Sequence, residues 1–307
     1  MAAVTEPRLV QAATLPRRWS PRRRRDARLA AVLLAPAVLV MVMLRVVPAV
    51  SALSESFRHL SLRTGVKDFV GFDNYLYLFG SSQFHSVLTT TLLFNLVINP
   101  VIVVLSTALA LLLAQRLPLA GLWRSLIFVP AAVPGSVVAL IWSTAMQPDG
   151  LLNSALRLVG LPPQPFLTSS SQALGSIGVM LAWGAIGYWM LFVIAGLKDI
   201  PVALYEAAMI DGAGWWQRLV SITLPLLRRP MAFVLVACTV GSFLAFAPVQ
   251  ILTKGGPDNS TTLLMYDVYT NAYQVGDLGV AQAEVVVLMA LLAVIVAFQF
   301  RMMREER

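Results

Sequence analysis

The chain has 307 residues, of which 58% are hydrophobic and only 12% are charged. Soluble proteins carry about 25% charged residues, so this composition excludes an ordinary soluble domain and favours a protein whose solvent is the lipid bilayer. The formal net charge is +8. Because many of its arginines precede a long apolar run, we attribute this charge to an anionic membrane surface and not to nucleic-acid binding.

Six apolar runs are long enough to cross a hydrocarbon core, which takes about 20 helical residues. We therefore predict an all-α integral membrane protein with six transmembrane helices, following an arginine-rich tail over residues 1–28. The transmembrane domain is expected over residues 29–307, with spans near 29–53, 86–114, 124–146, 173–197, 231–252 and 279–300.

The distribution of lysine and arginine predicts the orientation of these spans, since cytoplasmic loops carry the excess of both residues. With both termini inside, the inner segments hold 17 basic residues and the outer segments hold five. We therefore expect both termini in the cytoplasm of a multi-pass protein of the cytoplasmic membrane. The loop over residues 198–230, between the fourth and fifth spans, is then cytoplasmic as well.

Several kinds of active site lack the residues they need. The sequence has no G-x-x-x-x-G-K-[ST] phosphate-binding loop. Two histidines and one cysteine are too few for a metal-ligand cluster or a cysteine–histidine nucleophile at useful spacing. We therefore predict a non-catalytic chain that binds no metal and no cofactor of its own.

The 198–230 loop has the pattern of a helix-turn-helix. Asp199 is placed to cap a first helix, and Gly212 and Gly214 supply the backbone conformations that end it. A second helix is expected from Trp215 to about Leu224. An ordered structure of this kind in a cytoplasmic loop indicates a docking surface for another protein.

The spacing within this loop carries a resemblance to a known family. Glu206-Ala207-Ala208 is followed after three residues by Gly212, and nine residues later by Ile222-Thr223-Leu224-Pro225. This pattern resembles the EAA signature of bacterial binding-protein-dependent ABC importer permeases. Four further blocks are similar to the carbohydrate branch of that family, with its maltose- and glycerol-phosphate-type permeases: residues 70–75, 122–124, 139–142 and 252–257.

The resemblance implies the type I ABC importer permease fold, and it also implies the proteins and the substrate with which the chain works. They are a second homologous permease subunit, two cytosolic ABC ATPase subunits that bind ATP and Mg²⁺, an extracytoplasmic solute-binding protein and a carbohydrate substrate. The EAA helix would dock in a groove of the ATPase. The residues assigned to this coupling are Glu206, Ala207, Ala208, Asp211, Gly212, Ala213, Gly214, Leu224 and Pro225.

Polar and aromatic side chains inside the spans are candidates for lining a substrate pathway, because lipid disfavours them. The tentative set is Tyr188, Ser242, Trp183, Gly135 and Asn99. By the resemblance, Tyr188 falls where the maltose-type permease contacts its sugar. Gly135 is smaller than the polar residue of that permease, which implies a different substrate or contacts from the paired subunit. The aromatic residues are equally expected in a packing face, and Asn95 with Asn99 in hydrogen bonds between helices.

Glu284 is an unusual residue for the sixth span. If it is a proton or cation site, the chain is a self-sufficient secondary transporter, and this is the alternative to an ATP-driven importer. Two simpler roles are also open. The side chain can extend to the outer interface, or it can find a polar partner across a subunit interface.

Overall fold

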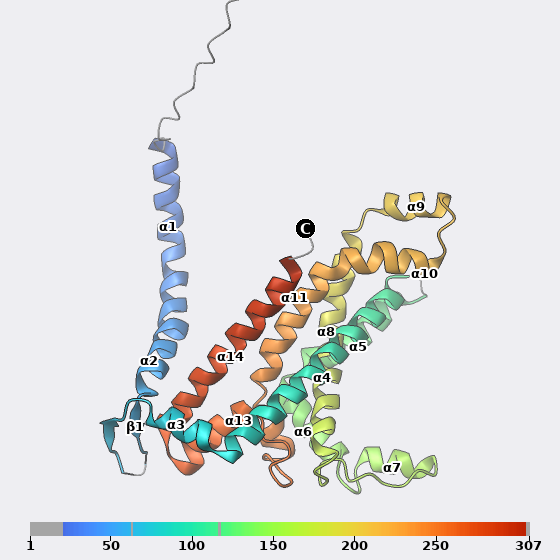
Figure 1. Cartoon of the computed structure of the whole chain (residues 1–307). Helices are drawn as coiled ribbons and strands as arrows, with labels where there is room; N and C mark the ends of the chain where they lie inside the picture. Colours follow the sequence, from blue (N-terminus) through green and yellow to red (C-terminus); the bar gives the residue numbers. More distant parts are fainter. Residues whose placement is uncertain (1–20, 63, 116–117, 305–307) are drawn as a thin grey trace, which may run out of the picture. The chain divides into compact units, whose positions relative to one another are not determined.

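The computed structural model describes residues 21–62, 64–115 and 118–304, which are mainly helical (Figure 1). Most of the predicted arginine-rich tail, residues 1–20, lies outside the described residues. The chain divides into two compact units, residues 1–51 and 52–307. The first unit holds α1 (Pro21–Met41), a π-helical turn (Val42–Val46) and the start of α2 (Val47–Glu55).

Five helices are long and apolar enough to cross a membrane, or six if one bent pair is counted as a span. This finding confirms the predicted all-α membrane fold. The straight candidates are Leu29–Glu55, Ser82–Leu113 (α4), Ala173–Lys198 (α8), Trp215–Phe243 and Leu278–Met302. The last of these lies within α14 (Leu278–Arg304).

The third predicted span is the bent pair. Its two halves, α5 (Ala120–Ala132) and α6 (Gly135–Ala145), meet at an angle of 94°. Val133 lies between them with φ −88° and ψ 136°. Because Val133 precedes Pro134, whose ring clashes with a helical conformation of the preceding residue, the chain turns here instead of continuing as one helix.

The helical segment of the fifth span also differs from its predicted bounds. The second helix of the loop does not end near Leu224. Instead, α10 (Trp215–Arg218) continues through a π-helical turn (Leu219–Thr223) into α11 (Leu224–Phe243). The wide turn directly precedes Pro225, which lacks the N–H that a regular α-helical bond requires. The residues that follow form a separate short helix, α12 (Ala247–Leu252).

The first helix of the loop, α9 (Val202–Ile210), has Pro201 at its N-cap position and no side-chain cap. Asp199 does not cap it as predicted, because it belongs to the end of α8 as the C-cap residue. Gly212 has a φ of +79°, as expected of a residue that ends a helix. Gly214 differs, since its φ of −68° and ψ of 170° describe extended backbone.

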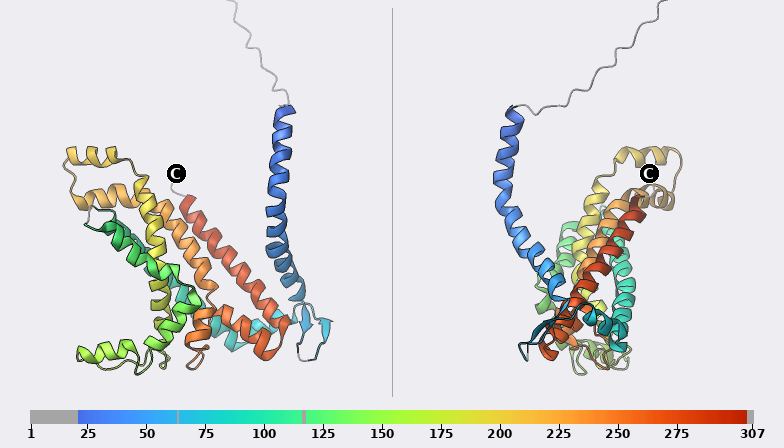
Figure 2. Two further views of the ribbon diagram at one scale, coloured as in Figure 1. Left: turned by 180° about the vertical axis from the view of Figure 1, so that it is seen from behind. Right: turned by 60° about the vertical axis from the view of Figure 1, so that its left-hand side comes forward.

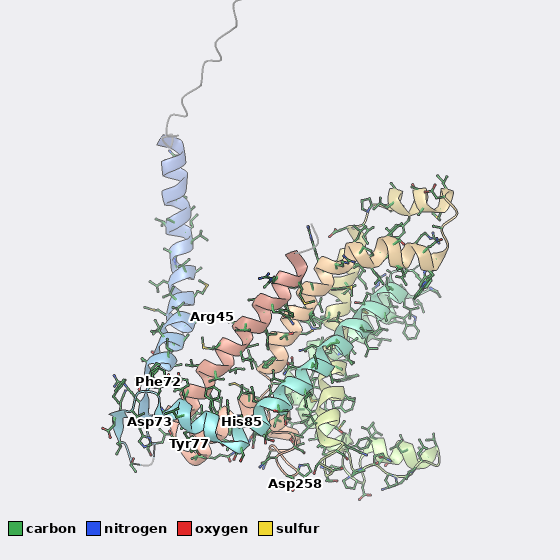
Figure 3. The ribbon with its side chains drawn as sticks, in the orientation of Figure 1. Arg45, Phe72, Asp73, Tyr77, His85 and Asp258 are labelled. Carbon is green, nitrogen blue, oxygen red and sulfur yellow. The ribbon has the colours of Figure 1, made fainter. Side chains whose placement is uncertain are left out.

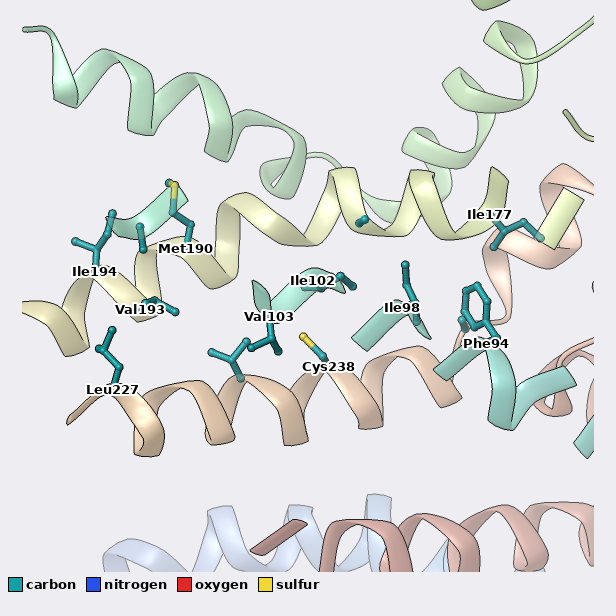
Figure 4. Close-up of a cluster of buried hydrophobic side chains, with 14 of the residues drawn as sticks. Phe94, Ile98, Ile102, Val103, Ile177, Met190, Val193, Ile194, Leu227 and Cys238 are labelled. Atoms are coloured by element: carbon teal, nitrogen blue, oxygen red, sulfur yellow. The ribbon is translucent and has the colours of Figure 1, made fainter. Parts of the chain in front are cut away.

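The core of the second unit lies between α4, α8 and α11, which run side by side (Figures 1 and 2). Figure 4 shows buried aliphatic side chains that fill the space between them, among them Ile102 of α4, Met190 of α8 and Leu227 of α11. Because Gly187 of α8 has no side chain, the backbone of α5 can approach α8 closely at this position. A Cβ at this position would lie 2.0 Å from the carbonyl oxygen of Ile127.

The opposite end of this unit from α9 holds the connecting elements. They are a hairpin of β1 (Arg58–Leu60) and β2 (Lys67–Phe69), α3 (Asp73–Gly80), α7 (Leu151–Leu158), α13 (Leu264–Tyr269) and a π-helical turn (Thr270–Val275). Asp73 and Tyr77 of α3 and the loop residue Asp258 lie at this end (Figure 3). Asn74 Nδ2 donates hydrogen bonds to the carbonyls of Ser56 and Arg58, which fixes the hairpin to α3.

We predict that Gly187→Ala destabilises the protein. The added methyl group would push α5 away from α8, and overpacking of this kind costs about 1–3 kcal/mol. The control is Gly184→Ala on the same helix, where a Cβ meets nothing within 4 Å. Thermal unfolding in detergent, followed by tryptophan fluorescence, should show a lower Tm for Gly187→Ala alone. Equal Tm values for the two variants would contradict the close approach.

Candidate functional site

The loop of α9 and α10 is a closed and well-defined turn. The Ala213 N–H donates to the carbonyl of Ala208 at 2.8 Å, and the Gly212 N–H donates to that of Met209 at 3.1 Å. These two bonds with a positive φ at Gly212 form a Schellman motif. At the far side of the loop, the hydroxyls of Tyr205 and Thr223 hydrogen bond at 3.0 Å. The turn therefore holds α9 in a defined position beside the start of the fifth span.

The surface of this loop combines exposed apolar side chains with an exposed acid. Ile210 is 87% exposed and Trp216 is 67% exposed. Glu206 is also exposed, and it forms no ion pair or hydrogen bond with any residue that the structure describes. Ala207 is exposed and Ala208 half-buried, so one side of α9 presents small residues next to the acid. Such a surface suits a protein partner better than water.

Two of the predicted pathway residues, Asn99 and Ser242, lie together in a buried polar network. The Ser242 hydroxyl lies 2.8 Å from Oδ1 of Asn99 and 2.5 Å from Oδ1 of Asn95. Thr239 joins the network through its hydroxyl, which accepts a hydrogen bond from Nε2 of Gln299 at 2.9 Å. The network connects α4, α11 and α14. The expected hydrogen bonding of Asn95 and Asn99 between helices is confirmed.

The other three pathway residues lie apart from this network and from one another. Trp183 is 42% exposed, and its ring meets that of Trp142 edge to face at 5.7 Å. Tyr188 is 44% exposed and contacts the rings of Trp189 and Phe192 on its own helix. Five residues separate Trp183 from Tyr188, so they point about 140° apart around α8. Gly135, at the start of α6, is exposed.

Glu284 is buried within its own chain, which is contrary to one of the two simple roles considered for it. The side chain is 0% exposed, and Oε1 accepts a hydrogen bond from Nδ2 of Asn271 at 2.8 Å. The carboxyl also lies beside that of Asp267 in α13. The side chain therefore does not extend to the interface, and its Oε2 has no hydrogen-bond partner among the described residues.

Asp267 was not singled out from the sequence, although a lone acid in the apolar run Leu264-Met265-Tyr266 is a visible signal. Its Oδ1 accepts a hydrogen bond from Nε2 of Gln83 at 3.2 Å. Burial raises the pKa of the Asp267 carboxyl above its usual value, and its contacts with Glu284 and Gln83 oppose this rise only in part. Asp267 and Glu284 thus connect α13 to α14, and Gln83 adds α4.

The comparisons with known proteins agree with this arrangement. Residues 102–304 match the family described as binding-protein-dependent transport system inner membrane component. The chain belongs to this family. The matched range includes the α9–α10 loop, the network residues Thr239, Ser242 and Gln299, and Glu284, whereas the hairpin, α3, Asn95 and Asn99 lie outside it.

Relatives of this inner membrane component cover nearly the whole chain. It is 33% identical to the sulfoquinovosyl glycerol transport system permease protein SmoG of Agrobacterium fabrum, over 92% of each chain. It is 31% identical to the trehalose/maltose transport system permease protein MalF of Thermococcus litoralis, over 84% of this chain and 88% of that one. It is 32% identical to the sn-glycerol-3-phosphate transport system permease protein UgpA of Pectobacterium atrosepticum, over 90% of this chain and 94% of that one.

A solved structure confirms the fold. The chain superimposes on a bacterial ABC transporter involved in import of the acidic polysaccharide alginate with a TM-score of 0.79, over 92% of this chain and 97% of that one. The sequence identity is 24%, so this comparison concerns the fold. The family match and the relatives identify the chain as a permease subunit of a binding-protein-dependent transport system.

We predict that the stability of this permease falls as the pH rises through the raised pKa of Asp267. An unfolded aspartate is already ionised above its ordinary pKa of about 3.9. The folded chain holds the proton to a higher pH, so it binds more protons than the unfolded chain and loses stability as they dissociate. Asp267→Asn should reduce this loss, when Tm is measured in detergent from about pH 4 to pH 8.

The exposed β2 residue Asp68 provides the matched control for this experiment. Asp68→Asn removes the same charge from a solvated strand, and the pH dependence of Tm should stay as in the parental protein. A pH dependence that is equal in all three proteins would show that Asp267 is not the group responsible.

Proposed function

We propose that the chain is the membrane subunit that receives the ATPase power stroke in an importer of a sugar, polyol or sugar phosphate. The observation that carries this proposal is the α9–α10 loop of a family permease. The loop is closed by a Schellman motif at Gly212, and it presents Glu206 without a partner among the described residues. A rigid turn with an open acid and exposed apolar side chains has the properties of a mechanical coupling surface.

Within this proposal, the coupling residues have distinct roles. Glu206 makes the polar contact with the ATPase groove, and Ala207 with Ala208 permits close approach. Gly212 sets the turn, with Asp211, Ala213 and Gly214 around it. Movement of the loop reaches the bundle directly, because α10 continues through Leu224 and Pro225 into the fifth span. An extended linker at this point would absorb the motion, whereas a continuous helix transmits it.

The proposed assembly contains a second homologous permease, two cytosolic ATPase subunits and an extracytoplasmic solute-binding protein. ATP and Mg²⁺ are bound by the ATPase subunits. The loop of α9 and α10 then faces the cytoplasm, as do both termini. The hairpin, α3 and α7 face the opposite compartment, where the solute-binding protein docks. The excess of basic residues on the loop side supports this orientation.

The substrate class rests on the relatives, whose names refer to trehalose and maltose, to glycerol 3-phosphate and to sulfoquinovosyl glycerol. Hydroxyl groups are common to all of these solutes. A transport pathway for them would run along the side of α8 that carries Tyr188, whose ring offers an aromatic face. Trp183 points to another side of α8, where it packs against Trp142 of α6, the helix that begins at Gly135. Asn99 and Ser242 hydrogen bond to one another within the bundle, and we place them behind this pathway as supports.

We predict that Gly212→Pro abolishes coupling. Proline requires a φ near −65° and has no N–H, whereas Gly212 has a φ of +79° and donates to Met209. In the complex reconstituted in vesicles, solute-stimulated ATP hydrolysis and uptake should fall to background, while membrane insertion persists.

Glu206→Ala should weaken ATPase binding. Uptake by the parental complex should stop on ATP depletion even with a proton gradient held, which separates this mechanism from a secondary transporter.

Gly160 provides a closely matched control for the backbone change. It ends α7 with a φ of +74°, and its Schellman bonds join Gly160 to Arg157 at 3.1 Å and Leu161 to Leu156 at 2.9 Å. Gly160→Pro therefore imposes the same strain at the other end of the unit. Coupled transport should survive in Gly160→Pro. Normal uptake by Gly212→Pro would overturn the coupling role of the loop.

We predict that Tyr188→Ala lowers uptake about two- to tenfold, since one aromatic contact is worth about 0.5–1.5 kcal/mol. Tyr188→Phe should keep most of the uptake, because it retains the ring face. Uptake is measured with maltose, glycerol 3-phosphate and sulfoquinovosyl glycerol, using whichever solute the parental complex transports. Phe298→Ala on α14, also an exposed aromatic residue, is the control. Parental uptake by Tyr188→Ala would remove this residue from the pathway.

A further inference from the structure

A groove of about 380 Å³ opens between α4, α11 and α14, toward the end of the bundle that carries α9 and α10. Its floor and walls are apolar and come from all three helices, with Val103, Met231, Ala232 and Leu235 among them. The groove is distinct from the proposed pathway along α8, and it takes no part in the coupling loop.

Two consecutive arginines, Arg228 and Arg229, line the same groove, and both are exposed. They lie in the first turns of α11, where the fifth span leaves the coupling loop. No acidic side chain is found among the described residues that line the groove. The groove is therefore apolar along its length and carries two arginines where the span meets the surface.

Gln299 of α14 lines the groove at a deeper level than the arginines, where its Nε2 donates a hydrogen bond to Thr239 of α11. The groove thus combines two cations with an apolar wall of aliphatic and thioether side chains. An anionic phospholipid has the complementary parts, namely a phosphate and an acyl chain.

We propose that this groove binds one anionic phospholipid of the adjoining leaflet, with phosphatidylglycerol as the type. The phosphate contacts Arg228 and Arg229, and an acyl chain follows Ala232 and Leu235. Basic clusters at the cytoplasmic ends of spans attract anionic headgroups. The identity of the leaflet rests on the proposed orientation of the α9–α10 loop, whereas binding itself does not depend on transport.

The test measures lipid occupancy of the purified full chain in detergent by native mass spectrometry. Phosphatidylglycerol and phosphatidylethanolamine of equal chain length are titrated separately. The parental chain should retain one phosphatidylglycerol in preference to phosphatidylethanolamine. Arg228→Gln/Arg229→Gln should weaken phosphatidylglycerol binding roughly 25-fold, because each basic residue at an anionic surface contributes roughly fivefold.

Two further variants make the test specific. Lys198→Gln/Arg218→Gln removes the same charge at the same end of the bundle but outside the groove, and it should change the affinity by less than about twofold. Ala232→Phe fills the groove and leaves both arginines in place, so it should also displace the lipid. This variant keeps the test decisive if the arginine double variant does not fold.

Three results would overturn the proposal: equal retention of the two lipids by the parental chain, equal loss in both charge variants, or full competition by inorganic phosphate. The assay uses neither ATP nor solute. Failure of the coupling experiments would therefore leave the lipid result unaffected, and the reverse holds as well.

Discussion

The second unit of this protein depends on one constraint, which is that hydrocarbon provides no hydrophobic force to hold helices together. Association in lipid relies on close van der Waals approach and on polar groups that satisfy each other inside the bundle. Gly187 supplies the first, where the α8 backbone approaches the Ile127 carbonyl. Asn95, Asn99 and Ser242 supply the second, since lipid offers no alternative partner for these side chains.

The same constraint explains where the chain departs from straight spans. A proline frees a carbonyl from its helical bond, and the structure accommodates the loss locally. Before Pro225 it widens the helix by a π-helical turn and keeps it continuous. At Pro134 the preceding residue takes an extended conformation, and the helix axis turns by 94°. One proline thus preserves a rigid connection, whereas the other creates a bend beside the proposed pathway.

The polar features of the bundle fall into separate regions with separate tasks. The exposed loop of α9 and α10 presents its residues outward, and α10 joins it to the bundle core as a continuous helix into α11. The Asn–Ser network lies inside, and the pair of Asp267 and Glu284 joins α13 to α14 near the opposite end. A basic groove at the loop end completes the set. The proposed drive and the proposed lipid contact therefore involve different residues, which allows each to be altered separately.

Much of this protein could be predicted from sequence because the signals are local or periodic. Long apolar runs give the membrane helices, and the spacing from Glu206 to Pro225 gives the family. The positive φ at Gly212 follows from its place after a helix. One prediction from local sequence was wrong. Asp199 ends α8 instead of capping α9, and Pro201 takes the N-cap position of α9.

The sequence by itself determined the class of protein, the membrane fold and the position of the α9–α10 loop, since each depends on residues within one continuous stretch. Only the tertiary structure decided what the isolated polar residues contact. Glu284 meets Asp267 and Asn271, Ser242 meets Asn99, and Arg228 borders a groove shared with Val103. These pairs are far apart in sequence, and lipid leaves each polar group to find its partner wherever the helices bring one within reach.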